Sequence, residues 1–220
     1  MGKYKVSYLF LIISIILVLY TLIRLLIDYL KYKNNDNSKI TGYDISKRVL
    51  DNNEIDNIDI IEARDGGSLY NVRRRVIKLS TKVYYGTSDY DRAIALHEVS
   101  HAVLDSRNNS YINFFKKIFT DLRFYSVSSY IVLIISYLLS GNGYNGISLL
   151  VFIIIFLYQY MVKCIENNSY SIAVNELERI DDIDKENIRN ILANSNIRYN
   201  ISLIVTILAI ARVLVFVLLK

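Results

Sequence analysis

The sequence of 220 residues has very few residues of several chemically specialised types. It contains no proline, one cysteine and two histidines. The single Cys164 excludes an internal disulfide and fits a reducing compartment. Two histidines cannot supply a metal site with three imidazole ligands, so the third protein ligand of any histidine site in this chain is predicted to be a carboxylate. The lack of proline is a compositional bias that indicates no function.

Long uncharged apolar runs place the chain among membrane proteins. Hydrophobic residues make up 53% of the sequence, and the mean hydropathy is positive. Residues 6–23 carry no charge and are numerous enough to cross a bilayer as a helix, and Arg24 can reach the interface at their end. A cleaved signal peptide is the alternative, but the apolar run is too long and no small-residue cleavage site follows it. We therefore predict a retained anchor, residues 1–30.

A second uncharged run covers residues 124–162 and is too long for one span. It is interrupted by residues 141–146, which are rich in glycine and asparagine and have the composition of a turn. We interpret the run as a helical hairpin with two spans, at residues 124–140 and 147–162.

A fourth apolar stretch, residues 201–219, contains Arg212. An arginine inside a span usually faces other helices or water, so a packing or snorkelling role is expected for this side chain. Four spans divide the chain into five predicted parts: an N-terminal anchor (1–30), a soluble domain with an interfacial helix (31–123), a transmembrane hairpin (124–162), a helical segment (163–200) and a C-terminal span (201–220).

The basic residues near the span ends predict the orientation of the chain. Seven of them border the same side of the membrane in a four-span arrangement: Lys31, Lys33, Lys116, Lys117, Arg123, Lys163 and Arg198. The positive-inside rule then predicts a multi-pass protein of the cell membrane, with residues 31–123 and 163–200 on the cytoplasmic face. The formal net charge of +5 fits contact with an anionic leaflet. The basic residues are too scattered to predict nucleic-acid binding.

The soluble part predicts a small domain of helices and strands. Thr41 and Asp44 have the spacing of a capping box and begin a short amphipathic helix. Residues 58–63 and 76–80 have the composition of strands, with a glycine turn between them, and predict a small antiparallel sheet. The exposed edge of such a sheet can hold an extended peptide by backbone hydrogen bonds. Residues 111–123 mix aromatic and basic side chains and predict an interfacial amphipathic helix.

Both histidines lie in one pentapeptide, residues 97–101, which has the pattern H-E-x-x-H. Ser88 resembles the N-cap of a helix that continues through this motif. Residues four apart on a helix share one face, so His97 and His101 can bind one ion. The pattern is typical of zinc sites in which the adjacent glutamate, here Glu98, takes a proton from the zinc-activated water. The alternative is a surface helix on which two histidines happen to lie four residues apart.

The third ligand must lie on the same side of the membrane as His97, so an even number of spans must separate the two. Residues 163–200 meet this condition because the predicted hairpin crosses twice. This segment offers seven acidic residues: Glu166, Glu176, Glu178, Asp181, Asp182, Asp184 and Glu186. Glu166 is the best placed for a site close to the bilayer, because it lies at the membrane-proximal start of the segment. Spacing alone leaves the others open, since any of them can belong to a solvated helix face.

Four segments of the chain resemble the YugP-type neutral zinc metallopeptidases, a family of membrane-bound bacterial proteins. They are residues 41–50 (family pattern T-G-x-x-x-A-x-x-I-L), 70–80 (Y-D-P-R-x-x-V-V-x-L-S), 83–102 (V-Y-x-G-x-S followed by A-A-H-E-V-G-H-A) and 166–173 (E-x-D-A-S-x-x-A). The resemblance implies a zinc peptidase in which Glu166 is the third ligand. Ser100 and Asn168 depart from the family pattern, and Asn168 removes an acidic residue that could have oriented a ligand histidine.

The predicted fold class is an α+β membrane protein that is mostly helical. It has four transmembrane helices and a small zincin-like catalytic domain with a short β-sheet. The predicted function is hydrolysis of peptide bonds through a zinc-activated water, with Glu98 as the general base. His97, His101 and Glu166 are the predicted ligands of Zn²⁺. The expected partners are a peptide or membrane-protein substrate and the lipid bilayer, and not nucleic acid.

The sequence leaves two questions about this site open. The donor that stabilises the oxyanion would be Tyr170, Tyr84 or Tyr85, and no pattern selects among them. The alternative function is a non-catalytic membrane scaffold with a structural zinc site, closed by Cys164 as a fourth protein ligand. A site closed in this way has no open position for water.

Overall fold

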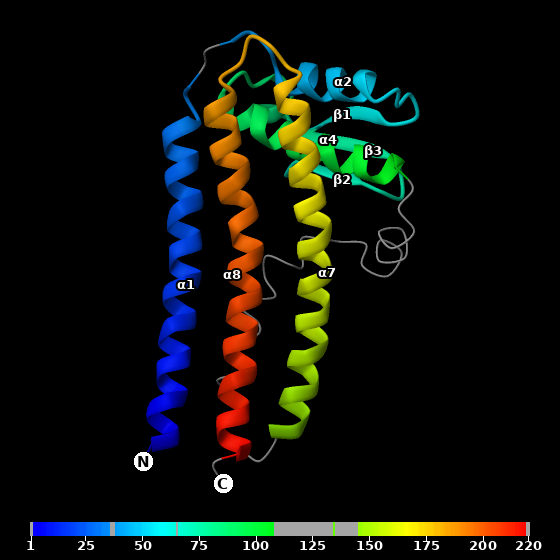
Figure 1. Cartoon of the computed structure of the whole chain (residues 1–220). Coiled ribbons are helices and arrows are strands. Elements are labelled where there is room, and N and C mark those ends of the chain that lie inside the picture. Colours follow the sequence, from blue (N-terminus) through cyan, green and yellow to red (C-terminus); the bar gives the residue numbers. More distant parts are fainter. Residues whose placement is uncertain (1, 36–37, 65, 108–133, 135–144, 219–220) are drawn as a thin grey trace. The chain divides into compact units, whose positions relative to one another are not determined.

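The computed structural model describes residues 2–35, 38–64, 66–107, 134 and 145–218 (Figure 1). Its helices and strands within these residues are α1 (Gly2–Tyr32), α2 (Gly42–Asn52), β1 (Asp59–Ala63), β2 (Leu69–Asn71), β3 (Val76–Ser80), α3 (Thr81–Tyr85), α4 (Asp89–Ser106), α7 (Asn145–Glu178) and α8 (Lys185–Leu218). The chain divides into two compact units. The helical unit is Met1–Arg24, Asp121–Cys164 and Ile197–Lys220, and the mixed unit is Leu25–Thr120 and Ile165–Asn196.

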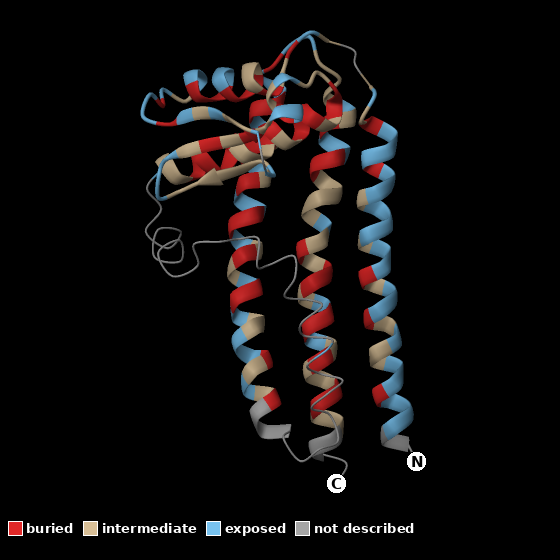
Figure 2. Ribbon diagram, turned by 180° about the vertical axis from the view of Figure 1, so that it is seen from behind, coloured by how far each residue is buried: buried red, intermediate tan, exposed pale blue. Residues whose placement is uncertain are grey.

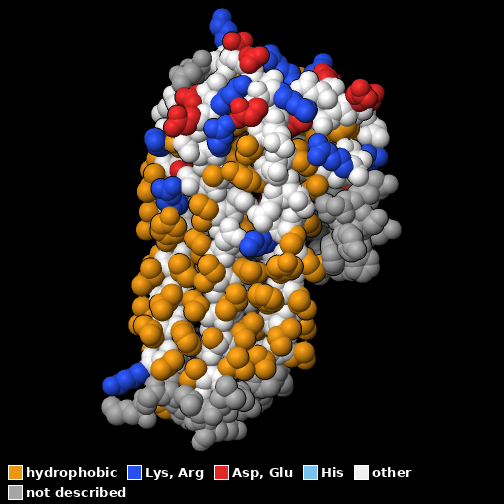
Figure 3. All heavy atoms as spheres, viewed as in Figure 1, with side chains coloured by type: hydrophobic (Ala, Val, Ile, Leu, Met, Phe, Trp, Pro, Cys, Tyr) orange, Lys and Arg blue, Asp and Glu red, His pale blue; other side chains and the backbone are white. Residues whose placement is uncertain are grey.

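In the helical unit, parts of α1, α7 and α8 lie side by side, and α8 contacts both of the others (Figures 1 and 2). Phe152 of α7 packs against Val213 of α8. Val18 of α1 packs against Val205 of α8. Hydrophobic side chains cover much of the face of these helices that Figure 3 shows, and many large hydrophobic residues of α1, α7 and α8 are exposed. An apolar exterior of this kind suits helices whose backbone polar groups are satisfied within each helix and whose side chains face lipid.

Three helices in the described part of the chain are long and apolar enough to cross a membrane. They are Tyr4–Tyr32 in α1, Ser148–Glu178 in α7 and Lys185–Val215 in α8. These helices cover three of the four predicted spans, so the number of candidate spans is corrected from four to three within the described residues. The remaining predicted span, residues 124–140, and the predicted interfacial helix, residues 111–123, fall almost wholly outside the described residues.

Polar side chains of different helices are joined by hydrogen bonds in the described part of the helical unit. The Nε of Arg212 donates to the Oγ of Ser7 at 2.7 Å. The Oγ1 of Thr206 donates to the Oε1 of Gln159 at 2.5 Å. All four side chains are buried, and bonds between helices satisfy polar groups that are costly in an apolar bundle. The packing role expected for Arg212 is therefore confirmed.

The mixed unit contains a three-stranded sheet in the order β1-β3-β2. β1 and β3 run parallel, with Ile60 opposite Ile77, and β2 and β3 run antiparallel, with Tyr70 opposite Ile77. The predicted antiparallel pairing of the first and last strands is therefore wrong. The intervening segment forms the short strand β2 and then turns at Arg75, whose φ is 52°, so that β3 lies between the other two strands. A strand of three residues is too short to show an alternating pattern.

Two helices of the mixed unit begin at caps that the sequence provides. Thr41 and Asp44 form the predicted capping box of α2, because each side chain accepts a hydrogen bond from the backbone N–H of the other residue. Ser88 caps α4 and accepts a hydrogen bond from the N–H of Asp91. α4 then continues to Ser106 and carries residues 97–101 in its middle.

α4 lies in the core of the mixed unit. The side chains that it buries completely are Ala95, Leu96, Val99, Ala102 and Val103. They belong to one apolar core with residues of α2, the sheet, the end of α7 and the start of α8. Figure 2 shows the buried positions along these elements. The two ends of α7 and α8 that belong to this unit therefore pack around the helix that carries both histidines.

The N-terminal end of α4 is fixed by a buried ion pair. Arg92 and Asp89 are both fully buried, and the Nη1 of Arg92 lies 3.0 Å from the Oδ1 of Asp89. The Nε of Arg92 also donates to the carbonyl of Ile40 at 2.9 Å. A buried pair of this kind needs such additional hydrogen bonds to offset its desolvation. These contacts hold α4 to the segment that precedes α2.

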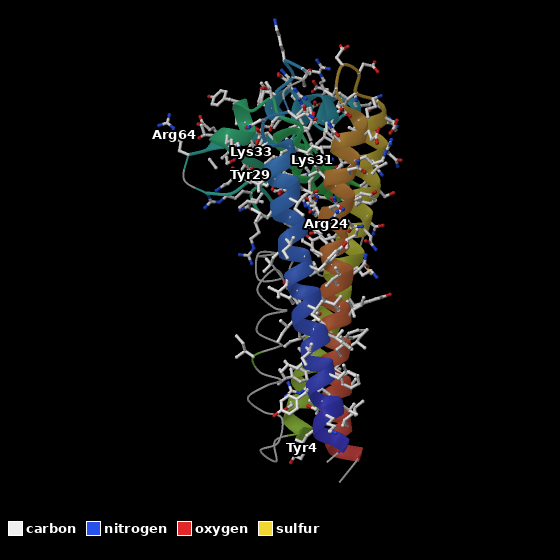
Figure 4. The ribbon with its side chains drawn as sticks, turned by 90° about the vertical axis from the view of Figure 1, so that its left-hand side faces the viewer. Tyr4, Arg24, Tyr29, Lys31, Lys33 and Arg64 are labelled. Atoms are coloured by element: carbon white, nitrogen blue, oxygen red, sulfur yellow. The ribbon has the colours of Figure 1, made fainter. Side chains whose placement is uncertain are left out.

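Aromatic and basic side chains gather where α1 ends in the mixed unit. The Nζ atoms of Lys33 and Lys82 lie 5.4 Å and 4.9 Å from the centroid of the Tyr29 ring. Figure 4 shows Tyr29, Lys31 and Lys33 at this end of the helix. Tyrosine and lysine are typical residues for the end of a membrane-spanning helix, where the aromatic ring and the charged group both reach the interface.

Candidate metal centre

Two helices of the mixed unit bring together three side chains of the types that bind metal ions. α4 contributes His97 and His101 on one face, and α7 contributes Glu166. The side chains of His101 and Glu166 are 9% and 3% exposed, whereas that of His97 is 20% exposed. The cluster is therefore mostly enclosed, and His97 is its most solvent-accessible member.

The three donor atoms are separated by the distances that a tetrahedral zinc site requires. The Nε2 atoms of His97 and His101 are 3.3 Å apart, and the Oε2 of Glu166 lies 3.6 Å from each of them. Ligand atoms at about 2.0–2.2 Å from a tetrahedral zinc ion lie roughly 3.3–3.6 Å from one another. Two imidazoles and one carboxylate also form a donor set that zinc accepts readily. The residues therefore fit the metal without rearrangement.

Cys164 does not join this cluster. It precedes Glu166 by two residues in α7 and is exposed, and residues two apart on a helix do not share a face. The group of potential ligands found among the described residues contains only the two histidines and Glu166. No observation in the described part of the chain therefore favours the closed, structural zinc site that the sequence left open.

Other acidic residues of the predicted segment are engaged elsewhere. The buried Oε1 of Glu176 accepts hydrogen bonds from Asn53 and Arg179. Glu178 forms an ion pair with Arg189, and Asp184 accepts a hydrogen bond from the N–H of Asn187 near the start of α8. Of the seven acids in the segment, Glu166 is the one that the structure brings to the histidines.

Glu98 follows His97 on α4 and contacts the edge of the sheet. Its Oε2 accepts a hydrogen bond from the backbone N–H of Tyr70 in β2 at 2.8 Å. β2 is an edge strand, so this amide points away from β3 and toward α4. The carboxylate of the motif thus satisfies a backbone donor that an edge strand would otherwise present to solvent.

Two residues near the site were not indicated by the sequence. The hydroxyl of Tyr70 donates to the Oδ2 of Asp105 at 2.8 Å. Burial, followed by the hydrogen bond and the charge of Asp105, raises the pKa of Tyr70 well above its ordinary value. The phenol therefore stays neutral and remains a hydrogen-bond donor. Asp105 follows His101 by four residues, a helical spacing that could have indicated it, whereas Tyr70 was marked only as the first residue of the segment 70–80 that resembles the family.

The three tyrosines considered as oxyanion donors have different surroundings in the structure. The hydroxyl of Tyr85 donates to the Oε2 of Glu62 at 3.3 Å, and Tyr84 packs between the rings of Tyr43 and Tyr85. Tyr170 lies on α7 four residues after Glu166, a spacing that places it on the same side of that helix. Tyr170 is thus the one of the three that shares a helix face with a member of the cluster.

The fold and the cluster define a helical membrane protein with a metal site of the zinc-hydrolase type, and the comparison with known families agrees. The family described as "Putative neutral zinc metallopeptidase" matches residues 7–218, so the chain belongs to this family. The predicted family is therefore confirmed.

One relative of the chain is the protein named "Putative membrane protease YugP" from Bacillus subtilis (strain 168). It is 29% identical over 134 residues, which are 60% of this chain and 59% of the relative. The match thus spans less than two thirds of the relative's own length. No solved structure matches the chain.

Proposed function

We propose that this protein is a membrane-embedded zinc endopeptidase. His97, His101 and Glu166 bind the metal, and Glu98 is the general base. The observation that carries the proposal is the separation of the three donor atoms by 3.3–3.6 Å, combined with a glutamate that directly follows the first histidine on the same helix. Membership of a zinc metallopeptidase family supports the same chemistry.

Zinc, when bound, polarises the scissile carbonyl and lowers the pKa of a coordinated water to about 7. Glu98 accepts the proton that the attacking water loses, so that the water oxygen bonds to the carbonyl carbon. Glu98 then returns the proton to the amine nitrogen when the C–N bond breaks. The products are one carboxylic acid, which releases its proton to the amine or to solvent, and one amine, and the base ends the cycle in its starting state.

The proposed substrate is a peptide or a segment of a membrane protein. β2 lies at the edge of the sheet and contacts α4 through Tyr70. Backbone groups of the sheet edge other than the Tyr70 amide, which already donates to Glu98, can hold an extended chain by hydrogen bonds. The same chain carries three membrane-capable helices, which supports a substrate that is itself embedded in the membrane.

Removal of the metal tests the proposed function directly. The purified full-length protein, loaded with one zinc ion, is expected to hydrolyse an unstructured protein substrate. A strong chelator should abolish this hydrolysis, and added zinc should restore it. The reason is that the three protein ligands cannot polarise the carbonyl or activate the water without the metal. Fragment analysis by mass spectrometry measures the reaction. Hydrolysis that continues unchanged after the zinc content falls to zero would contradict the proposal.

We also propose that the mixed unit lies on the cytoplasmic face of the membrane. The basic residues at the end of α1, Lys31 and Lys33, support this orientation. A reporter inserted after Lys39 is expected to be active in the cytoplasm, and one inserted at residues 141–146 is expected to be active only outside. The reverse pattern would place the metal site on the extracytoplasmic face and leave the chemistry unchanged.

A further inference from the structure

Tyr70 connects the edge strand of the sheet to the helix that carries the motif, and it does so twice. Its backbone N–H donates to the Oε2 of Glu98 at 2.8 Å, and its hydroxyl donates to the Oδ2 of Asp105 at 2.8 Å. One residue of β2 thus supplies a backbone contact to the proposed base and a side-chain contact farther along the same helix.

The two acceptors on α4 are separated by seven residues, which is two helical turns or about 10 Å along the axis. Positions seven apart return to nearly the same side of a helix. The contacts of Tyr70 therefore bracket His101 along α4. Together they fix where β2 lies along the helix, because a shift of the strand would break one contact or both.

The backbone contact has a specific consequence for the Glu98 side chain. Glutamate has three rotatable side-chain bonds, so an exposed carboxylate samples many positions at an entropic cost when it is ordered. A backbone amide has a fixed direction once its strand is held in place, and a charge-assisted hydrogen bond to it is about twice as strong as a neutral one. Binding of Oε2 by this amide restricts the direction in which the carboxylate presents its second oxygen.

The side-chain contact supports the backbone contact. β2 contains only three residues, so few ladder hydrogen bonds hold it to β3. Tyr70 is partly buried against the core of the mixed unit, and its phenol remains a neutral donor to Asp105. The hydroxyl thus fixes an edge strand that its own pairing holds weakly.

We propose that Tyr70 is the positioning residue of Glu98. Its hydroxyl anchors β2 to Asp105, and the anchored strand presents the Tyr70 amide that orients the Glu98 carboxylate. This role rests on the proposed peptidase function, in which Glu98 is the base. Tyr70 acts through Glu98 and Asp105, so its loss is expected to change the rate of the chemical step more than the binding of substrate or metal.

The first test compares kinetic constants of the full-length, zinc-loaded protein. In Tyr70→Phe and in Asp105→Asn, kcat is expected to fall roughly 10-fold or more, since displacement of a catalytic group by about 1 Å can cost about 10²-fold. KM and zinc content should stay close to those of the unmodified protein. The double variant should be no slower than the slower single variant, because both substitutions remove the same hydrogen bond between Tyr70 and Asp105.

Thr81→Val is the matched control. The hydroxyl of Thr81 donates to the Oε1 of Glu62 at 2.7 Å. Glu62 belongs to β1, in the same sheet as Tyr70, but this contact does not involve α4. Its loss should leave kcat unchanged. If Tyr70→Phe keeps the kcat of the unmodified protein, or if kcat falls only together with zinc content, Tyr70 does not position the base.

A second measurement does not depend on activity. Hydrogen–deuterium exchange at the Tyr70 amide should become faster in Glu98→Ala, which removes the acceptor, and also in Tyr70→Phe, which removes the anchor. Thr81→Val should leave this exchange unchanged. Equal exchange rates in all variants would overturn the proposal. If the unmodified protein cleaves no substrate, the peptidase function fails, and the exchange rates still decide whether Tyr70 holds the Glu98 carboxylate.

Discussion

Replacement of Glu98 by glutamine is expected to leave zinc bound while peptide hydrolysis falls by at least about 10²-fold, the usual loss when a general base is removed. The reason is that glutamine keeps the length of the side chain and one carbonyl oxygen but cannot accept the proton of the attacking water. Neither His97 nor His101 is altered, so the ligand set of the metal remains complete. Zinc content by elemental analysis and turnover of a peptide substrate measure the two effects.

Glu54→Gln provides the control for this experiment, because Glu54 is an exposed glutamate of the mixed unit. It should retain both zinc and activity. A Glu98→Gln variant that hydrolyses peptides at the normal rate would show that another group accepts the proton. A variant that loses zinc would instead assign Glu98 to metal binding, and the division of duties between the two glutamates would then be wrong.

Replacement of Glu166 by glutamine is expected to weaken zinc binding itself, and activity with it. The substitution removes a negatively charged ligand, and loss even of a group that only supports a ligand typically lowers metal affinity by about 10- to 100-fold. We therefore expect at least about a 100-fold increase in the dissociation constant for zinc, measured by competition with a chelator of known affinity. His97→Ala and His101→Ala should lose stoichiometric zinc for the same reason.

Two glutamates of the same helix serve as controls for Glu166. Glu176 is as deeply buried, at 2% against 3% exposure, but bonds to Asn53 and Arg179. Glu178 is exposed and pairs with Arg189. Glu176→Gln and Glu178→Gln should both retain zinc and activity. Normal zinc affinity in Glu166→Gln, with loss of zinc in Glu176→Gln at unchanged thermal stability, would reassign the third ligand.

Local features of the fold could be predicted because they depend on neighbouring residues. The capping box of Thr41 and Asp44, the cap at Ser88 and the strand β3 all follow from short patterns that the structure reproduces. The pairing of the strands could not be predicted in this way. Whether β3 lies beside β1 in parallel depends on where the chain between them folds, and three residues of β2 give no periodic signal.

The site shows the same division between local and non-local information. His97, Glu98 and His101 are adjacent in the sequence, and one helix suffices to bring the histidines together. Topology selected a segment with seven acids, and the membrane-proximal position of Glu166 and the family resemblance then favoured this residue. The packing of α7 against α4 brings Glu166 to the histidines, whereas Glu176, which has the same chemistry and similar burial, is bonded elsewhere. The contact of Tyr70 with Glu98 involves a backbone amide, which no sequence pattern identifies.

The placement of Glu166 on α7 has a consequence for the biosynthesis of the protein. α7 is one continuous helix from Asn145 to Glu178, and the same helix is apolar enough to cross a membrane. The ribosome completes α4 with its two histidines long before it reaches Glu166. During translation the nascent chain thus carries two of the three proposed ligands until a later helix has been made. In the proposed function, the metal site is therefore complete only when α7 has packed against α4.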